Sequence, residues 1–113
     1  MEISKRTSGG VTLLDLEGDL APPHGKMELR DAVTELVAAG QASILLNFQN
    51  VGFVSSAGIG ELVRSFQRVT EAGFTIKIAN LQPPVRDLLQ LMKLDRMLET
   101  FEAEEEAIRS FAA

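Results

Sequence analysis

The fold of this 113-residue chain is decided by the stretch LLNFQNVGFVSSAGIGELV, residues 45–63. Its first residues are apolar, polar turn residues follow, and Ser55 and Ser56 then precede a helix-period pattern with two glycines. This order predicts a buried strand, a loop and the start of a helix. Because the first N–H groups of a helix lack partners within it, a hydroxyl cap or a phosphate is favoured there. Ser55 and Ser56 are therefore the first candidates for a functional site.

Strand and helix patterns alternate on both sides of this stretch. Period-two segments predict an N-terminal hairpin and two further strands, and apolar residues at three-and-four spacing predict helices between them. Met92 in the third predicted helix and Ala103 in the last predicted helix are expected to face inward. Glu61 falls on the polar face of the second predicted helix. The sequence thus predicts an α/β fold with a mixed sheet of four to five strands and about four helices. The predicted strands cover residues 3–7, 11–18, 43–48 and 74–79, and a weak strand or turn signal covers residues 94–101. The predicted helices cover residues 26–39, 59–72, 85–93 and 102–111.

Three loops are expected to meet at one end of this sheet, because the carboxyl ends of parallel strands gather there. They comprise residues 21–25, 55–60 and 80–84. The paired prolines Pro22 and Pro23 predict that residues 19–25 form an exposed loop. Ligands and partners tend to bind at this end of such sheets, so the three loops form the candidate binding surface.

The composition excludes several classes of function. Eleven basic and sixteen acidic residues give a net charge of -5, which opposes binding to nucleic acid or to anionic lipid. The absence of cysteine excludes disulfides and thiolate chemistry, and one histidine without clustered carboxylates predicts no metal site and no cofactor. We see neither a signal peptide nor an apolar run of the roughly 20 residues that span a membrane, so a cytoplasmic location is expected.

The sequence offers little material for catalysis. His24, the single histidine, lies in a Pro-Pro-His-Gly segment, and Val54 stands where a serine hydrolase elbow around Ser56 would need its first glycine. Gly58 and Gly60 lack the third glycine of a dinucleotide-binding fingerprint. We therefore expect no enzymatic activity; an enzyme at the sheet end would be expected to lose turnover in His24→Ala.

The order of these motifs resembles the STAS domain and, more narrowly, the free-standing bacterial anti-sigma factor antagonists. The likeness spans nearly the whole chain, from Ile3 to Phe111, so that residues 1–113 are expected to form a single STAS domain. It is carried by LLNF at 45–48, VGFVSSAGIGELV at 51–63, GFTIKIAN at 73–80, VRDLL at 85–89 and Phe101.

The resemblance implies a regulatory binding protein. Such proteins are not enzymes: they bind an anti-sigma factor that is also a serine kinase of the histidine-kinase-like (GHKL) ATPase fold, and thereby release the sigma factor. The kinase phosphorylates a serine at the start of the helix after the central strand, which ends the binding, and a metal-dependent serine phosphatase reverses it. The matching serine in this chain is Ser56. A monomer or weak dimer is expected.

Two residues depart from the commoner form of the family motif. Ser55 stands where that form has Asp, and Ala57 stands where it has a second hydroxyl residue. Ser55 is therefore a rival phosphoacceptor, although it is the better candidate for the helix cap. The departure also leaves an alternative function open, a non-switching STAS interaction subunit of a signalling assembly or of a lipid-transport system. In either case the expected partner-binding residues are Ala21, Pro22, Pro23, His24, Ser55, Ser56, Ala57, Gly58, Ile59, Gly60, Arg64, Asn80 and Leu81.

Overall fold

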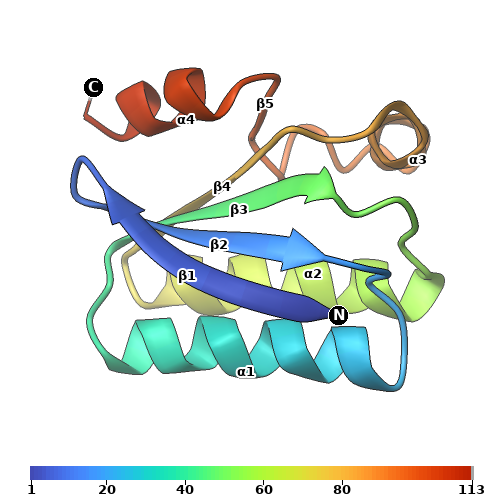
Figure 1. Cartoon of the computed structure of the whole chain (residues 1–113), viewed down its shortest axis with the longest axis horizontal. Coiled ribbons are helices and arrows are strands. Elements are labelled where there is room, and N and C mark those ends of the chain that lie inside the picture. Colours follow the sequence, from blue (N-terminus) through green and yellow to red (C-terminus); the bar gives the residue numbers. More distant parts are fainter. Residues whose placement is uncertain (113) are drawn as a thin grey trace.

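A mixed sheet with its strands in the order β1-β2-β3-β4-β5 runs through the computed structural model, which describes residues 1–112 (Figure 1). β1 is antiparallel to β2, whereas each later pair of neighbouring strands is parallel. The predicted fold, an N-terminal hairpin followed by parallel strands and helices, is confirmed. The elements are β1 (Glu2–Ser8), β2 (Val11–Glu17), α1 (His24–Ala38), β3 (Ser43–Asn50), α2 (Ser56–Glu71), β4 (Thr75–Ala79), α3 (Pro83–Leu91), β5 (Thr100–Phe101) and α4 (Glu104–Phe111).

Helices cover both faces of the sheet. Figure 1 shows α1 and α2 on one face and α4 on the other. Successive residues of a strand point to opposite faces, so Leu46 of β3 joins the large core beneath α1 and α2, while Leu45 joins a smaller cluster against Ala107 of α4. Burial on both sides explains the nearly continuous apolar run in β3. The central strands are fixed in place by apolar packing above and below.

The segment before α1 differs from the predicted exposed loop. Leu20 is fully buried, and the helix begins at His24 rather than at residue 26, with Gly25 buried in its first turn. The helix can start this early because Pro23 occupies the N-cap position, where the missing proline N–H costs nothing. A Cβ on residue 25 would lie 2.3 Å from the carbonyl oxygen of Asp19, so glycine is required for this close packing. The prolines therefore lead into a helix.

Two side chains predicted to face inward are instead exposed. Met92 is 49% exposed, and Ala103 is also exposed. Met92 is the C-cap residue of α3 and Ala103 the N-cap residue of α4, so neither continues the inward-facing row of its helix. Sequence periodicity predicts which residues form a helix better than it predicts where the helix begins and ends.

Candidate functional site

Backbone hydrogen bonds join the segment just before residues 21–25 to the segment that leads into α2. Leu20 and Val54 form an isolated parallel bridge, which extends the β2–β3 pairing beyond the ends of both strands. The Leu20 N–H donates to the carbonyl of Phe53 and the Ser55 N–H donates to the carbonyl of Leu20, each at 3.0 Å. The bridge holds the segment that leads into residues 21–25 beside the first turn of α2, as the sheet-end argument predicted.

The two serines at the start of α2 have different positions. Ser55 is the N-cap residue, with an extended backbone (φ -79°, ψ 170°), and its Oγ accepts a hydrogen bond from the Gly58 N–H at 3.0 Å. Its carbonyl accepts the first helical bond, from the Ile59 N–H at 2.8 Å. Ser56 is the exposed first residue of the helix. The prediction that Ser55 caps the helix is confirmed, and the cap does not use the hydroxyl of Ser56.

Gly58 makes the contact between the two loops possible. A Cβ at this position would lie 2.0 Å from the carbonyl oxygen of Leu20 and 2.9 Å from its carbonyl carbon. Gly58 is buried, as is Ile59, so both shape the surface from beneath. At Gly60 the nearest atoms to a Cβ would be the terminal nitrogens of Arg64 at 3.6 Å. The close backbone approach at Gly58 is therefore a contact within the chain.

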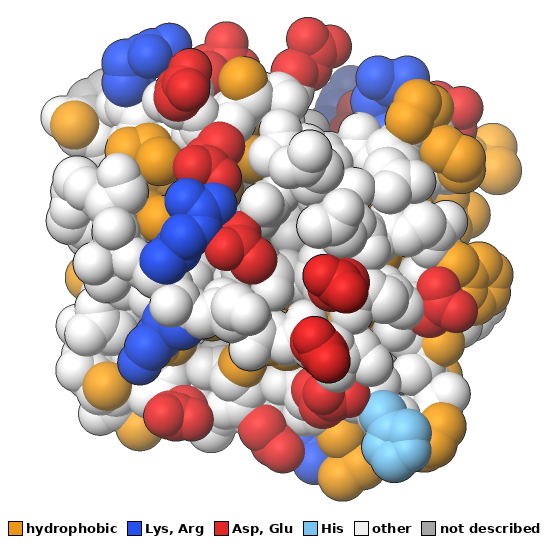
Figure 2. All heavy atoms as spheres, viewed as in Figure 1, with side chains coloured by type: hydrophobic (Ala, Val, Ile, Leu, Met, Phe, Trp, Pro, Cys, Tyr) orange, Lys and Arg blue, Asp and Glu red, His pale blue; other side chains and the backbone are white. Residues whose placement is uncertain are grey.

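The exposed surface around Ser56 is rich in apolar and proline side chains. Pro22, Pro23 and His24 are exposed, and Ala21 and Ala57 are half-buried. Figure 2 shows hydrophobic side chains along the side of the molecule on which Figure 1 places these loops and the start of α2. The predicted residues of these two loops thus lie close together on one side of the molecule.

Sequence reasoning missed two exposed apolar residues, one between β3 and α2 and one in α1. Phe53, three residues before Ser56, is 53% exposed, and Met27 in the second turn of α1 is 51% exposed. The signal at Phe53 is its place after Gly52 in a loop, beyond the last residue of β3. Large exposed apolar side chains in a monomer are informative when they cluster, because they mark surfaces that bind other proteins.

The third loop is attached to the end of β3. The Asn80 Nδ2 donates to Oδ1 of Asn47 at 3.0 Å, and Gln82 Nε2 donates to the carbonyl of Gln49 at 2.8 Å. Leu81 is half-buried. The Asn80 N–H also donates to the carbonyl of Phe101 in β5 at 3.1 Å. The loop therefore lies at the predicted end of the sheet, but these hydrogen bonds go to β3 and β5 rather than to the Ser55–Gly60 turn.

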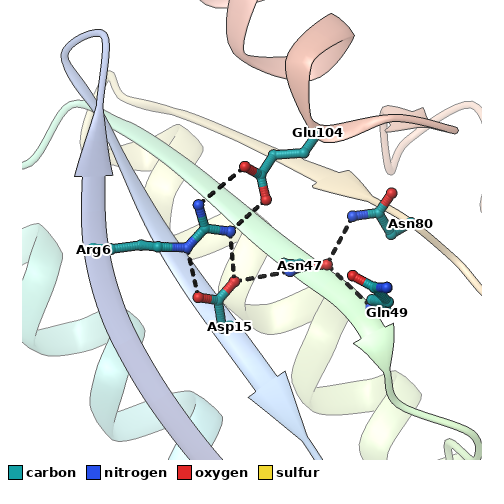
Figure 3. Close-up of polar contacts among 6 residues, drawn as sticks. All are labelled: Arg6, Asp15, Asn47, Gln49, Asn80 and Glu104. Carbon is teal, nitrogen blue, oxygen red and sulfur yellow. Dashed lines mark hydrogen bonds and ion pairs between the residues drawn. The ribbon is translucent and has the colours of Figure 1, made fainter.

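A polar network crosses the sheet on the face that α4 covers (Figure 3). Arg6 of β1 forms ion pairs with Asp15 of β2 and with Glu104 of α4. Asn47 donates to Oδ1 of Asp15 at 2.8 Å, and its own Oδ1 accepts from Asn80. The network thus links α4 to the strand ends that carry the site. Glu104 also lies in the acidic first turn of α4, where negative charge suits the helix dipole.

We expect Asp15→Asn to lower the free energy of unfolding at neutral pH by about 1 kcal/mol. Hydrogen bonds from Arg6 lower the pKa of Asp15; partial burial opposes this and the bond from Asn47 adds to it. A carboxylate with a lowered pKa stabilises the fold above its unfolded pKa, and this contribution is lost as pH falls through the folded pKa. Urea unfolding of both proteins should therefore show a difference at pH 7 that shrinks toward pH 2.

The control for removing one negative charge is Asp31→Asn, which changes an exposed carboxylate on α1. Its unfolding free energy at pH 7 should stay within about 0.5 kcal/mol of the wild-type value. A difference for Asp15→Asn that is independent of pH would contradict the assigned role of the carboxylate.

Glu61 is a correction to the predicted polar face of α2. Its side chain is only 1% exposed. It accepts a hydrogen bond from Ser65 Oγ at 3.1 Å and pairs with Nη1 of Arg68 at 3.4 Å and Nε of Arg64 at 3.7 Å. These partners make burial of the carboxylate tolerable. Arg64 itself is half exposed and folds back over Gly60.

Two classes of site have no counterpart in residues 1–112. No group of three or more His, Asp and Glu side chains there could hold a metal ion. None of the helices described is both long enough and apolar enough to cross a membrane.

Comparison with known proteins identifies the family to which this chain belongs. The model of the STAS domain matches residues 2–107. An anti-sigma F factor antagonist from Paenibacillus polymyxa is 24% identical over 109 residues, which cover 96% of this chain and 92% of that protein. The unphosphorylated form of the anti-sigma factor antagonist SpoIIAA has the same fold, with a TM-score of 0.75 and 20% identity over 99% of each chain. Phosphorylated Bacillus SpoIIAA gives a TM-score of 0.73 and 20% identity over 97% of this chain and 99% of its own. The match of the family model over nearly the full length shows that this chain belongs to the STAS domain family.

Proposed function

We propose that this protein is an anti-sigma factor antagonist controlled by phosphorylation of Ser56. It binds an anti-sigma factor that is a serine kinase of the GHKL ATPase fold, and this binding releases the sigma factor. The kinase ends the interaction by phosphorylating Ser56, and a metal-dependent serine phosphatase restores it. The observation that carries the proposal is the exposed Ser56 hydroxyl at the first position of α2, with Ser55 already serving as the cap. The function is one of binding, and the protein contributes no catalytic group.

The surroundings of Ser56 explain how a phosphate would act. A phosphoserine adds about -1.5 to -2 charges and a hydrated group. Pro22 and Pro23, which follow the bridged Leu20, and Phe53, three residues before Ser56, are exposed and offer an apolar contact surface. A partner that packs against this surface would have to desolvate the phosphate, and that cost falls on the complex rather than on the free protein.

The test is to incubate the protein with a purified anti-sigma factor kinase and ATP, and to map the modified residue by mass spectrometry. We expect modification of Ser56, and affinity for the kinase at least tenfold lower for the phosphorylated protein and for Ser56→Asp than for Ser56→Ala. Isothermal titration calorimetry measures these affinities. Ser55→Ala is the matched control, because loss of the cap costs about 1 kcal/mol of stability but leaves the acceptor in place. An unmodified Ser56 together with equal binding by Ser56→Asp and wild type would refute the proposal.

The alternative function is a STAS interaction subunit that does not switch. The observation that favours it is Ser55, because the commoner family motif has Asp at this position. Under this alternative the apolar surface around Phe53 still binds a partner, but no kinase modifies Ser56. Affinity capture that recovers transporter or signalling subunits and no GHKL ATPase would support it.

A further inference from the structure

We propose that Arg64 binds a phosphate on Ser56 from within the same helix and so stabilises the phosphorylated form. The inference rests on the proposed function only in placing the phosphate on Ser56. Arg64 was predicted from the sequence as a partner-binding residue, but the structure gives it a different set of neighbours. Its place in the switch follows from the position of its guanidinium over Gly60.

The spacing of residues along α2 places Arg64 on the same side of the helix as Ser56. Ser56, Gly60 and Arg64 are each four residues apart and therefore share one face of the helix. Long side chains on a helix point back toward its N-terminus. Both terminal nitrogens of Arg64 lie 3.6 Å from the position that a Cβ would take at Gly60. The guanidinium thus lies over Gly60, midway along the helix between Arg64 and Ser56.

The distance between the Arg64 guanidinium and Ser56 is one that a phosphate on Ser56 can bridge. Cβ positions four residues apart in a helix are separated by about 5–6 Å, so the guanidinium over Gly60 lies about one turn from the Cβ of Ser56. A phosphate on the Ser56 oxygen extends several ångströms beyond that Cβ. Small rotations of two exposed side chains are then enough for an Arg–phosphate pair, which guanidinium groups form in a bidentate geometry.

Arg64 can turn to a phosphate on Ser56 without leaving the carboxylate of Glu61 unpaired. The ion pair between Arg64 and the buried carboxylate joins Nε to Oε1 at 3.7 Å. The same carboxylate keeps the hydrogen bond from Ser65 and the ion pair with Arg68. Arg68 lies one turn further from Ser56 and is only 30% exposed, so it is the natural control. Removal of the last partners of a buried carboxylate would be costly, but that situation does not arise here.

The experiment uses the full chain with phosphoserine incorporated at position 56 during translation. The second ionisation of the phosphate is followed by ³¹P NMR as a function of pH in the wild-type background, in Arg64→Gln and in Arg68→Gln. A paired cation favours the dianion, so we expect the titration midpoint of Arg64→Gln to lie roughly 0.2–0.7 pH unit above that of wild type. Arg68→Gln should leave the midpoint unchanged, and Arg64→Lys should give an intermediate value. Glu61 and Glu71 of α2, Asp19 of the β2–α1 connection and His24 at the start of α1 are the same in these variants.

Equal midpoints in wild type and Arg64→Gln would overturn the inference, as would equal shifts in Arg64→Gln and Arg68→Gln. The unphosphorylated Arg64→Gln variant should have the wild-type circular dichroism spectrum, because Arg64 is half exposed. Since the phosphate is installed without a kinase, this result is separate from the proposed function. A shifted midpoint with no kinase able to modify Ser56 would leave the pairing in place and refute the switch.

Discussion

Replacing Gly58 by alanine is expected to lower the free energy of unfolding by about 2–4 kcal/mol. The added Cβ would lie 2.0 Å from the carbonyl oxygen of Leu20, a backbone atom that cannot rotate out of the way. Relief of the clash requires the β2–α1 connection to move away from α2, which breaks the hydrogen bond between Ser55 and Leu20. Urea unfolding followed by circular dichroism measures the loss. The same variant should bind the anti-sigma factor more weakly, because the two loops would separate.

The matched control is Gly60→Ala, two residues later in the same helix. The nearest atoms to its Cβ would be those of the flexible Arg64 side chain at 3.6 Å, an ordinary contact distance. Alanine also has a higher helix propensity than glycine by as much as about 1 kcal/mol. Gly60→Ala should therefore be neutral or stabilising. Equal unfolding free energies for the two variants would show that the contact at Gly58 does not govern the packing of this loop.

The framework of the fold could be predicted from the sequence because its signals are local and repeated. The apolar run of β3 and the three-and-four spacing of α2 each extend over several residues, and they lead to the mixed sheet observed. The position of Leu20 could not be predicted in this way. It is a single apolar residue in a segment with two prolines, and only the pairing with Val54 shows that it belongs to the sheet. Local pattern contains no information on such a pairing.

Some features of the site could likewise be predicted from the sequence, and others could not. The cap at Ser55 follows from the chemistry of a helix N-terminus, so it could be assigned from the sequence. The burial of Glu61 could not, because periodicity places it on the polar face and its burial depends on Arg68 and Ser65. The ion pair between Arg6 and Glu104 joins residues 98 positions apart. Contacts of that range depend on the tertiary arrangement, which no spacing rule describes.

The exposure of Phe53 leads to the second large effect. Phe53→Ala is expected to weaken binding to the anti-sigma factor by about 30-fold or more, the effect of losing an interface hot spot. Aromatic anchors dominate interface energies, and this one is 53% exposed three residues from Ser56. Because so much of the ring already lies in solvent, the unfolding free energy should change by less than about 1 kcal/mol.

The comparison that isolates this effect is Met97→Ala, which removes a side chain of similar exposure, 45%, beside the C-terminal half of α2. If the partner binds over the loops around Ser56, only Phe53→Ala will weaken the complex, as measured by calorimetry with the unphosphorylated protein. Equal losses for the two variants would place the interface along the whole of α2. A loss confined to Met97→Ala would move it away from Ser56 altogether, and phosphorylation of Ser56 could then act on binding only indirectly.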